Sequence, residues 1–274
     1  MTRLEISDHS KKVQTIVPLD YDYDMKFRSK GNLLRHFYYQ RKLSGHHFLS
    51  YSSYGEDAIV EGVFKRLHWM GFNNISFPKT YLDIGCYHPI KDSNTFFLYQ
   101  KGWKGTVVDP NIFFEPLFRK YRPKDNFFGN AVSNSSISLP YYVFGETASS
   151  NTMDKEFAEK IAYEQNLELP TPRYTSTISL ENLIDSHLKS FGEYPFIVNI
   201  DVEGMDEEIV DSFQPIWDIP FILVEDVSLG TFFDSDLKKK LRLKGYEPIA
   251  ANFLTTLYLR RNTEYYGNLI YSQP

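Results

Sequence analysis

The sequence has little that would suit a secreted or membrane protein. It contains one cysteine, Cys86, so no internal disulfide can form and a reducing compartment is indicated. No run approaches the roughly 18 apolar residues of a membrane span, and the opening residues MTRLEISDHSKK lack the apolar core of a signal peptide. The net charge of -5 gives no general preference for nucleic acid, so we expect neither DNA nor RNA as a partner. These absences predict a cytoplasmic protein without a transmembrane segment.

A strand-helix-strand unit between residues 81 and 111 is the most informative stretch of the chain. Tyr81–Ile84 reads as a buried strand that contains Asp83 and meets Gly85 in a tight turn. Gly105–Val108 reads as a second strand, and it ends in Asp109-Pro110. In open α/β sheets ligands lie beyond the carboxyl ends of the strands, where an acid after the second strand can bind both ribose hydroxyls of an adenosine. We therefore predict a nucleoside site that Asp83, Gly85 and Asp109 shape.

The absence of two glycine-rich motifs limits which nucleoside cofactor the site can bind. A dinucleotide site needs G-x-G-x-x-G so that the backbone can approach a pyrophosphate, but Cys86-Tyr87-His88-Pro89 follows Gly85. The G-x-x-x-x-G-K-[ST] loop of ATP and GTP sites is also lacking. An adenosine with a compact tail that carries no phosphate remains, and S-adenosylmethionine is the commonest cofactor of that kind.

Seven short motifs follow one another along the chain: Asp83-Ile84-Gly85, Ser93-Asn94-Thr95, Gly102-Trp103-Lys104-Gly105, Val108-Asp109-Pro110, Arg122-Pro123-Lys124-Asp125, Ala131-Val132-Ser133 and Ile200-Asp201-Val202-Glu203-Gly204. In order and spacing they resemble the FkbM-type methyltransferases, from about Ser50 to about Arg260. One departure is the bulky Cys86–Pro89 segment, which replaces the glycine-rich first loop of most class I methyltransferases.

The resemblance implies a fold and a reaction class. The fold is a class I, Rossmann-like α/β domain, with a mostly parallel seven-stranded sheet, a terminal antiparallel hairpin and helices on both faces. The reaction is S-adenosylmethionine-dependent O-methylation, often of sugars, glycans and natural products. The resemblance does not specify one acceptor.

The hydrophobic pattern predicts individual elements that agree with this fold. Asn126–Val132 reads as a third strand, and Pro195–Ile200 and Phe221–Val224 read as further buried strands. Tyr246–Ala250 and Thr255–Arg260 predict the terminal hairpin. Between Asn134 and Thr177 the pattern loosens around a strand (Leu139–Phe144) and a helix (Lys155–Gln165), which indicates an insertion that overhangs the site as a lid.

Several residues are candidates for binding the cofactor. Ser93, Asn94 and Thr95 lead a helix whose N-terminus suits the methionine carboxylate, although the triplet could simply cap that helix. The resemblance adds Glu56 or Asp57 near the methionine amino group, with a role at the start of their own helix as the alternative. The complete predicted set is Asp83, Gly85, Cys86, Ser93, Asn94, Thr95, Asp109, Pro110, Asn130, Ala131, Val132 and Glu56.

Methyl transfer to a hydroxyl also needs a base, which is worth roughly 10²–10⁴ in rate. Asp201 follows a strand beside the expected methyl site and is the first candidate, with His88 and Glu225 as the others. We expect Glu203 to pack or to cap the next helix. In an alternative arrangement Asp201, with Glu225 or Asp226, holds Mg²⁺ that polarises the acceptor hydroxyl.

The N-terminal residues differ from the rest in charge. Lys26–Phe48 carries six Lys or Arg, three His and no acid, so residues 1–48 are predicted to be an extension with a basic aromatic arm, and 49–274 the methyltransferase domain. The arm could bind an anionic partner or pack as a solvated helix. The predicted function is O-methylation of a sugar, a glycan or a related small molecule. The alternatives are an RNA or protein methyltransferase, and a catalytically silent partner that binds the cofactor.

Overall fold

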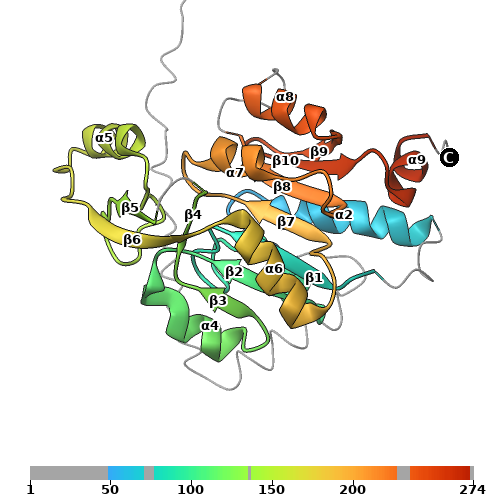
Figure 1. Ribbon diagram of the computed structural model, residues 1–274, viewed down its shortest axis with the longest axis horizontal. Coiled ribbons are helices and arrows are strands. Elements are labelled where there is room, and N and C mark those ends of the chain that lie inside the picture. Colours follow the sequence, from blue (N-terminus) through green and yellow to red (C-terminus); the bar gives the residue numbers. More distant parts are fainter. Residues whose placement is uncertain (1–48, 71–76, 135–136, 227–234, 272–274) are drawn as a thin grey trace, which may run out of the picture. The chain divides into compact units, whose positions relative to one another are not determined.

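The computed structural model describes residues 49–70, 77–134, 137–226 and 235–271 (Figure 1). In chain order its elements are α2 (Glu56–Trp69), β1 (Thr80–Ile84), α3 (Phe96–Gln100), β2 (Lys104–Val108), η2 (Ile112–Phe114), α4 (Glu115–Tyr121), β3 (Asn126–Phe128), β4 (Ala131–Val132), β5 (Ser138–Tyr141), α5 (Lys155–Glu164), β6 (Arg173–Ile178), α6 (Leu180–Phe191), β7 (Ile197–Ile200), α7 (Asp206–Ser212), β8 (Phe221–Glu225), α8 (Asp236–Leu243), β9 (Tyr246–Ala251), β10 (Thr255–Arg260) and α9 (Glu264–Tyr271).

The main sheet has seven strands in the order β3-β2-β1-β7-β8-β10-β9. β3, β2, β1, β7 and β8 are parallel, and β10 pairs antiparallel with both β8 and β9. The chain adds strands on one side of β1 and then returns to its other side with β7, so strand order reverses between β1 and β7. The predicted seven-stranded sheet with its terminal antiparallel hairpin is confirmed.

Helices cover both faces of this sheet (Figure 1). On one face, buried side chains of α6, α7 and α8 join the strands in one core, with Leu183, Val210 and Leu241 as examples. On the other face, aromatic rings of α2 and α9 pack against β8, since Phe64 and Tyr265 both contact Phe221. The abundance of aromatic residues therefore serves the core in this part of the protein.

The predicted third strand, Asn126–Val132, is two strands in two sheets. Phe128 lies opposite Val108, the last residue of β2, so the chain has no partner in the main sheet beyond that point. It turns at Gly129 and Asn130, and Ala131 then pairs with Thr177 in a second sheet of order β4-β6-β5. The prediction of one continuous strand is wrong because the partner strand ends first.

The predicted lid contains more regular structure than its sequence pattern indicates. β5 and α5 lie close to their predicted ranges, but β6 was not predicted. Its sequence, RYTSTI, follows Pro170 and Pro172, which are typical of a loop, and three of its six residues are exposed. β6 forms because β4 and β5 pair with its two sides.

Two sequence predictions concern the chain as a whole. None of the helices in the described ranges is long and apolar enough to cross a membrane. The basic arm, Lys26–Phe48, lies outside the described residues, so the division into an extension (1–48) and a methyltransferase domain (49–274) stays a prediction.

Candidate active site

A cavity of about 270 Å³ opens at the carboxyl ends of four strands of the main sheet. Gly85 follows β1, Asp109 follows β2, Asp201 follows β7 and Glu225 ends β8, and all four line it. The strand order reverses in the middle of this group, and open α/β sheets bind their ligands at such a point.

Gly85 brings the first loop into close contact with the end of β7. Its φ is +81°, and a Cβ atom placed on it would lie 1.7 Å from the backbone oxygen of Asp201. Its own amide donates to the carbonyl oxygen of Val108 at 3.0 Å. Any larger residue would have to move backbone, so glycine sets how closely the two strand ends approach each other.

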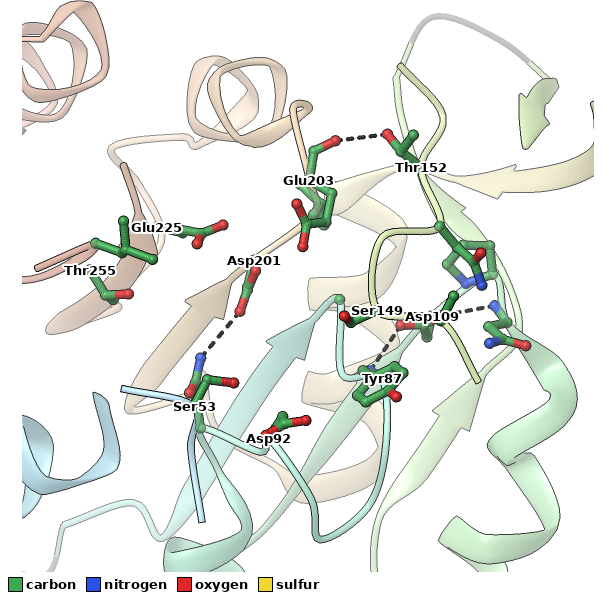
Figure 2. Close-up of a pocket in the computed structure, with 18 of the residues that line it drawn as sticks. Ser53, Tyr87, Asp92, Asp109, Ser149, Thr152, Asp201, Glu203, Glu225 and Thr255 are labelled. Atoms are coloured by element: carbon green, nitrogen blue, oxygen red, sulfur yellow. Dashed lines mark hydrogen bonds between the residues drawn. The ribbon is translucent and has the colours of Figure 1, made fainter. Parts of the chain in front are cut away.

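Asp109 is held by backbone amides on both sides. One carboxylate oxygen accepts from the amide of Tyr87 at 2.9 Å, and the other accepts from the amide of Asn111 at 2.7 Å (Figure 2). Burial raises the pKa of Asp109 to about 6. A carboxylate can accept about four hydrogen bonds, so lone pairs remain for a diol.

The loop between β5 and α5 covers the Asp109 end of the cavity. The side-chain amide of Asn111 donates to the backbone oxygen of Glu146 at 2.8 Å, and the hydroxyl of Tyr87 donates to that of Thr147 at 2.7 Å. Ala148 and Ser149 from the same loop line the cavity. The second sheet therefore supplies one wall of the site, as the predicted overhanging insertion would.

Three carboxylates meet at the other end of the cavity. Oxygen atoms of Asp201, Glu203 and Glu225 all lie within 4.8 Å of one another (Figure 2). Burial and the neighbouring negative charge of Glu225 raise the pKa of Asp201 well above its usual range. The same two causes, burial and nearby carboxylates, raise the pKa of Glu203 to about 8 and that of Glu225 to about 7. We call Asp201, Glu203 and Glu225 the carboxylate trio.

Backbone strain is concentrated around the cavity. Among the described residues that are not glycine, four have a positive φ: Tyr87 (45°), Asp92 (52°), Asn166 (52°) and Glu203 (50°). Three of them, Tyr87, Asp92 and Glu203, line the cavity. Such conformations cost about 1–3 kcal/mol each and persist where the surrounding structure enforces them, which is typical of functional sites.

Acidic side chains are the charged groups of the described cavity lining. Six carboxylates face it, those of Glu56, Asp92, Asp109, Asp201, Glu203 and Glu225. From the part of the chain that the structure describes, no lysine, arginine or histidine lines it. A phosphate group would find no cation there, whereas a ligand with positive charge would be attracted.

Comparison with known protein families decides the family. Residues 83–248 match the model of the methyltransferase FkbM domain, which is more than half of the 274 residues. This chain belongs to the FkbM methyltransferase family. The resemblance found in the sequence motifs is thereby confirmed, and with the observed strand order the predicted class I methyltransferase fold is confirmed as well.

Other comparisons are more distant. No curated protein sequence gives a significant match. Among solved structures, 1,6-didemethyltoxoflavin-N1-methyltransferase from Burkholderia thailandensis, with bound 1,6-didemethyltoxoflavin and S-adenosylhomocysteine, is 11% identical with a TM-score of 0.31, covering 84% of each chain. Magnesium protoporphyrin IX methyltransferase from Synechocystis PCC 6803, with bound S-adenosylhomocysteine, is 12% identical with a TM-score of 0.30, covering 82% of this chain and 94% of that chain. At such scores neither neighbour indicates the chemistry of this FkbM methyltransferase.

Part of the predicted cofactor set lines the cavity of this FkbM methyltransferase. That part comprises Glu56, Gly85, Asn94, Asp109 and Pro110. Glu56 lines the cavity, but its neighbour Asp57 does not. Asp57 instead accepts hydrogen bonds from Ser50, Tyr51 and Ser52. Of the two residues, Glu56 faces the cavity, and its role near the methionine amino group stays a prediction.

The remaining predicted residues lie outside the cavity lining: Asp83, Cys86, Ser93, Thr95, Asn130, Ala131 and Val132. Ala131 packs in a small core with Tyr141 and Met153. Tyr141 and Met153 do line the cavity, so β5 and the segment after it contribute side chains to the lining, whereas β4 contributes none. Their contribution could not be found from the sequence, because it depends on how β5 and the following loop fold back.

His88 and Asp226 take structural positions in the FkbM methyltransferase. Nδ1 of His88 accepts from the amides of Ile90 and Lys91, at 3.1 and 2.9 Å, and the residue does not line the cavity. Burial lowers the pKa of His88 to about 4. Asp226 accepts from the hydroxyl of Ser235 at 2.5 Å, and Glu203 occupies the place beside Asp201 and Glu225 that the sequence had suggested for Asp226. The expectation that Glu203 only packs or caps a helix does not describe its position.

Proposed function

We propose that this chain is an S-adenosylmethionine-dependent O-methyltransferase that acts on a hydroxyl of a sugar, a glycan or a related small molecule. One observation carries the choice of cofactor: the cavity has six carboxylates and, within the described residues, no cationic side chain. NAD, ATP and GTP carry phosphates, for which the described lining offers no cationic side chain, whereas S-adenosylmethionine has a sulfonium and an ammonium group that carboxylates can face. Membership of the FkbM methyltransferase family supports the same cofactor.

The proposed binding mode follows the two ends of the cavity. Asp109 would accept hydrogen bonds from the ribose hydroxyls, with Pro110 beside it, and Glu56 would face the ammonium group of S-adenosylmethionine. Asp109, Gly85 and Asp201 line one cavity, so a ligand could extend from the end of β2 past the end of β1 to the end of β7. S-Adenosylmethionine, when bound, supplies an activated methyl group that an acceptor oxygen attacks in line.

The carboxylate trio would then serve the acceptor. We assign Asp201 as the base, because it follows β7 in the middle of the site, with Glu225 as a neighbouring carboxylate. Holding the acceptor in attack geometry is worth about 7–11 kcal/mol, and a positioned base adds roughly 10²–10⁴ in rate. A carboxylate whose pKa is raised by burial and by like charge is a better proton acceptor than an exposed one.

A Mg²⁺ ion is the competing arrangement at the same place. Carboxylate oxygens suit this ion, and the three groups lie within 4.8 Å of one another. Acids that face one another are also common without a metal, and the base assignment needs none. Asp201, Glu203 and Glu225 would be its ligands, and the ion would polarise the acceptor hydroxyl.

Calorimetry tests the proposed cofactor. The purified chain should bind S-adenosylmethionine and S-adenosylhomocysteine but neither NAD nor ATP. Binding of NAD or ATP with no binding of the methyl donor would overturn the proposal.

An acceptor screen tests the proposed reaction. Labelled S-adenosylmethionine is offered with sugars, sugar nucleotides and cell-surface glycans, and O-methylated product is expected from at least one of them. Product from RNA or protein alone would support the alternative substrate classes. Tight cofactor binding without any product would support the silent partner, in which the N-terminal arm is an interface.

A further inference from the structure

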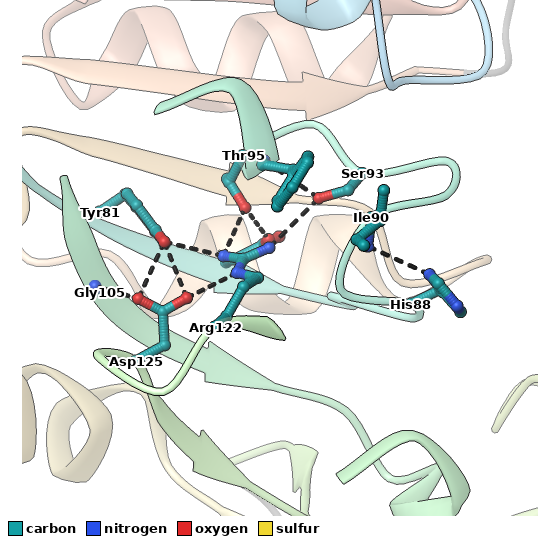
Figure 3. Close-up of polar contacts among 10 residues, drawn as sticks. Tyr81, His88, Ile90, Ser93, Thr95, Gly105, Arg122 and Asp125 are labelled. Atoms are coloured by element: carbon teal, nitrogen blue, oxygen red, sulfur yellow. Dashed lines mark hydrogen bonds and ion pairs between the residues drawn. The ribbon is translucent and has the colours of Figure 1, made fainter. Parts of the chain in front are cut away.

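Arg122 is a charged side chain with no access to solvent. Its exposed fraction is 0%, and its Nε donates to Asp125 Oδ2 at 2.6 Å. Figure 3 shows the guanidinium surrounded by hydroxyl groups, and it donates to Tyr81 at 2.9 Å, Ser93 at 3.3 Å and Thr95 at 2.9 Å. Burying a cation is expensive unless it is paired and fully hydrogen-bonded, and every partner here is polar.

The contact with Thr95 determines how that hydroxyl is used. A threonine hydroxyl has one hydrogen, and Thr95 Oγ1 accepts from Arg122 while it donates to Asp83. The second oxygen of Asp83 accepts from Asn199 Nδ2 at 2.9 Å. An ionised carboxylate only accepts, so Asp83 requires a donor on each side.

The hydrogen bonds of Asp83 also determine how the next residues, toward the cavity, donate and accept. Because Asn199 donates its amide hydrogens to Asp83, its Oδ1 faces Asn94, whose Nδ2 lies 3.2 Å away. The same Nδ2 of Asn94 lies 3.5 Å from Asp201 Oδ2. Asn94 and Asp201 both line the cavity, whereas Arg122, Asp83 and Asn199 are buried behind it.

We propose that Arg122 is a positioning residue for methyl transfer: through Thr95 it keeps Asp83 as an acceptor, and Asp83, through Asn199, makes Asn94 present its amide hydrogens to Asp201. This inference rests on the proposed function, in which Asp201 is the base. It explains why β1 carries a carboxylate that does not line the cavity, and it gives Arg122 a part in the reaction although it touches no ligand.

Thr95 variants test the chain of contacts better than Arg122 variants. Replacing Arg122 removes the counter-ion of the buried Asp125 carboxylate, which keeps its hydrogen bonds to Tyr81 and Gly105, so a loss of folding would be uninformative. Thr95→Val keeps the shape but removes the link from Arg122 to Asp83, and Thr95→Ser keeps the link. Ser93→Ala is the matched control, because Ser93 does not line the cavity, neighbours Asn94 in sequence and has no bond to Asp83. Its hydroxyl accepts from Arg122 and from the amide of Phe96, so this variant also loses two hydrogen bonds.

The first readout is the side-chain amide signal of Asn199 in protein labelled with ¹⁵N-asparagine. Asn199 contacts both Asp83 and Asn94, so Ser93→Ala, which changes a neighbour of Asn94 but no contact of Asp83, separates the two routes by which the signal could shift. We expect Thr95→Val to shift this signal and Thr95→Ser and Ser93→Ala to leave it in place. An unchanged signal in Thr95→Val, or an equal shift in Ser93→Ala, would overturn the inference.

The second readout is calorimetry with S-adenosylhomocysteine as the probe. Asn94 lines the cavity, so a change in the direction of its amide should also reach the ligand. We expect Thr95→Val to weaken the binding of S-adenosylhomocysteine about tenfold, the effect of roughly one hydrogen bond, and Ser93→Ala to change it less than twofold. Equal affinities in the two variants would also contradict the inference. If the wild-type chain does not bind the probe, the proposed function fails, and the amide signal still decides whether the contacts are coupled.

Discussion

The hydroxyl of Thr152 donates a hydrogen bond of 2.8 Å to the backbone carbonyl oxygen of Glu203 (Figure 2). Thr152 precedes α5 in the part of the chain that overhangs the site, and its exposed fraction is 1%. Glu203 has the left-handed φ of 50° and belongs to the carboxylate trio. The overhanging segment therefore holds a strained residue of the loop after β7 in the conformation that aims its side chain into the cavity.

Removing this hydrogen bond should affect turnover as well as stability. Thr152→Val leaves the Glu203 carbonyl oxygen without its partner, so the free energy of unfolding should fall by about 1–2 kcal/mol. Because the strained backbone is then released, the kcat for methyl transfer should fall about tenfold. Thr152→Ser, which keeps the hydroxyl, should retain both values. An unchanged kcat in a folded Thr152→Val protein would show that the contact does not position Glu203.

Gly85→Ala should disrupt the site more than an alanine does at another glycine with a left-handed backbone. The new Cβ would lie 1.7 Å from the Asp201 backbone oxygen, so the loop after β1 and the end of β7 must separate. Gly192→Ala is the matched control, since Gly192 has a φ of +80° and no heavy atom within 4 Å of its added Cβ. We expect both to lose about 1–2 kcal/mol from the left-handed backbone, measured by urea unfolding.

Only Gly85→Ala should in addition lose the binding of S-adenosylhomocysteine in calorimetry. If the two alanine variants bind equally well, the close approach at Gly85 does not shape the ligand site.

Cofactor affinity should depend on the ionisation of Asp109. Its pKa is raised to about 6, mainly by burial, so the carboxylate is ionised above pH 6 and becomes neutral as the pH falls below it. Binding of S-adenosylhomocysteine should therefore weaken between pH 7.5 and 5. Asp109→Asn should weaken it about 10–100-fold at pH 7.5, the effect of a hydrogen bond to a charged group.

Asp218→Asn is the control for this experiment, because the Asp218 side chain is 83% exposed and does not line the cavity. It should bind like the wild type. Full affinity in Asp109→Asn would exclude Asp109 from ligand binding.

Chelation separates the two roles of the carboxylate trio. If Asp201 acts as the base, turnover should be the same with and without EDTA, which is the outcome we expect. If the trio holds Mg²⁺, EDTA should abolish turnover and added Mg²⁺ should restore it. Restoration by Mg²⁺ in the wild type but not in Glu203→Gln would assign the metal to this cluster.

Because His187 is buried and neutral in the folded protein, the free energy of unfolding should be lower in mild acid than at neutral pH. It is fully buried on α6, its Nδ1 lies 3.0 Å from Thr106 Oγ1, and its Nε2 has no partner among the described residues. Burial, with the charge of Lys104, lowers its pKa to about 4. In the unfolded chain its pKa is about 6.5, so below pH 6.5 the unfolded state binds a proton that the folded state refuses.

The free energy of unfolding should therefore fall by up to about 3 kcal/mol between pH 6.5 and 4. His187→Gln should lose this part of the pH dependence in urea unfolding, and His68→Gln, at an exposed position on α2, should keep it. Equal pH profiles for His187→Gln and the wild type would contradict the assignment.

The fold could largely be predicted from residue patterns. The strand at Tyr81–Ile84 is apolar and short, and Gly85 after it predicts a turn, as observed. The terminal hairpin also follows from local pattern. The split of Asn126–Val132 into two strands does not, because it depends on where β2 ends in space.

The site could be predicted only in part. That Asp109 and Asp201 follow strands is visible in the sequence, since the carboxyl ends of parallel strands meet at one edge of a sheet. The direction of a side chain is not visible there. Asp83 faces Thr95 and Asn199 instead of the cavity, and Glu203 enters the cavity because its backbone is held at a positive φ.

Arg122 shows the same division. In the sequence it belongs to a polar turn with a proline, Arg122-Pro123-Lys124-Asp125, which is typical of a surface. In the structure it is fully buried, because hydroxyls from β1 and the loop before α3 surround its guanidinium. The sequence by itself determined which polar residues follow the strands, and in which order they come along the chain. Tertiary packing decided which polar groups reach the ligand, since that depends on partners distant along the chain.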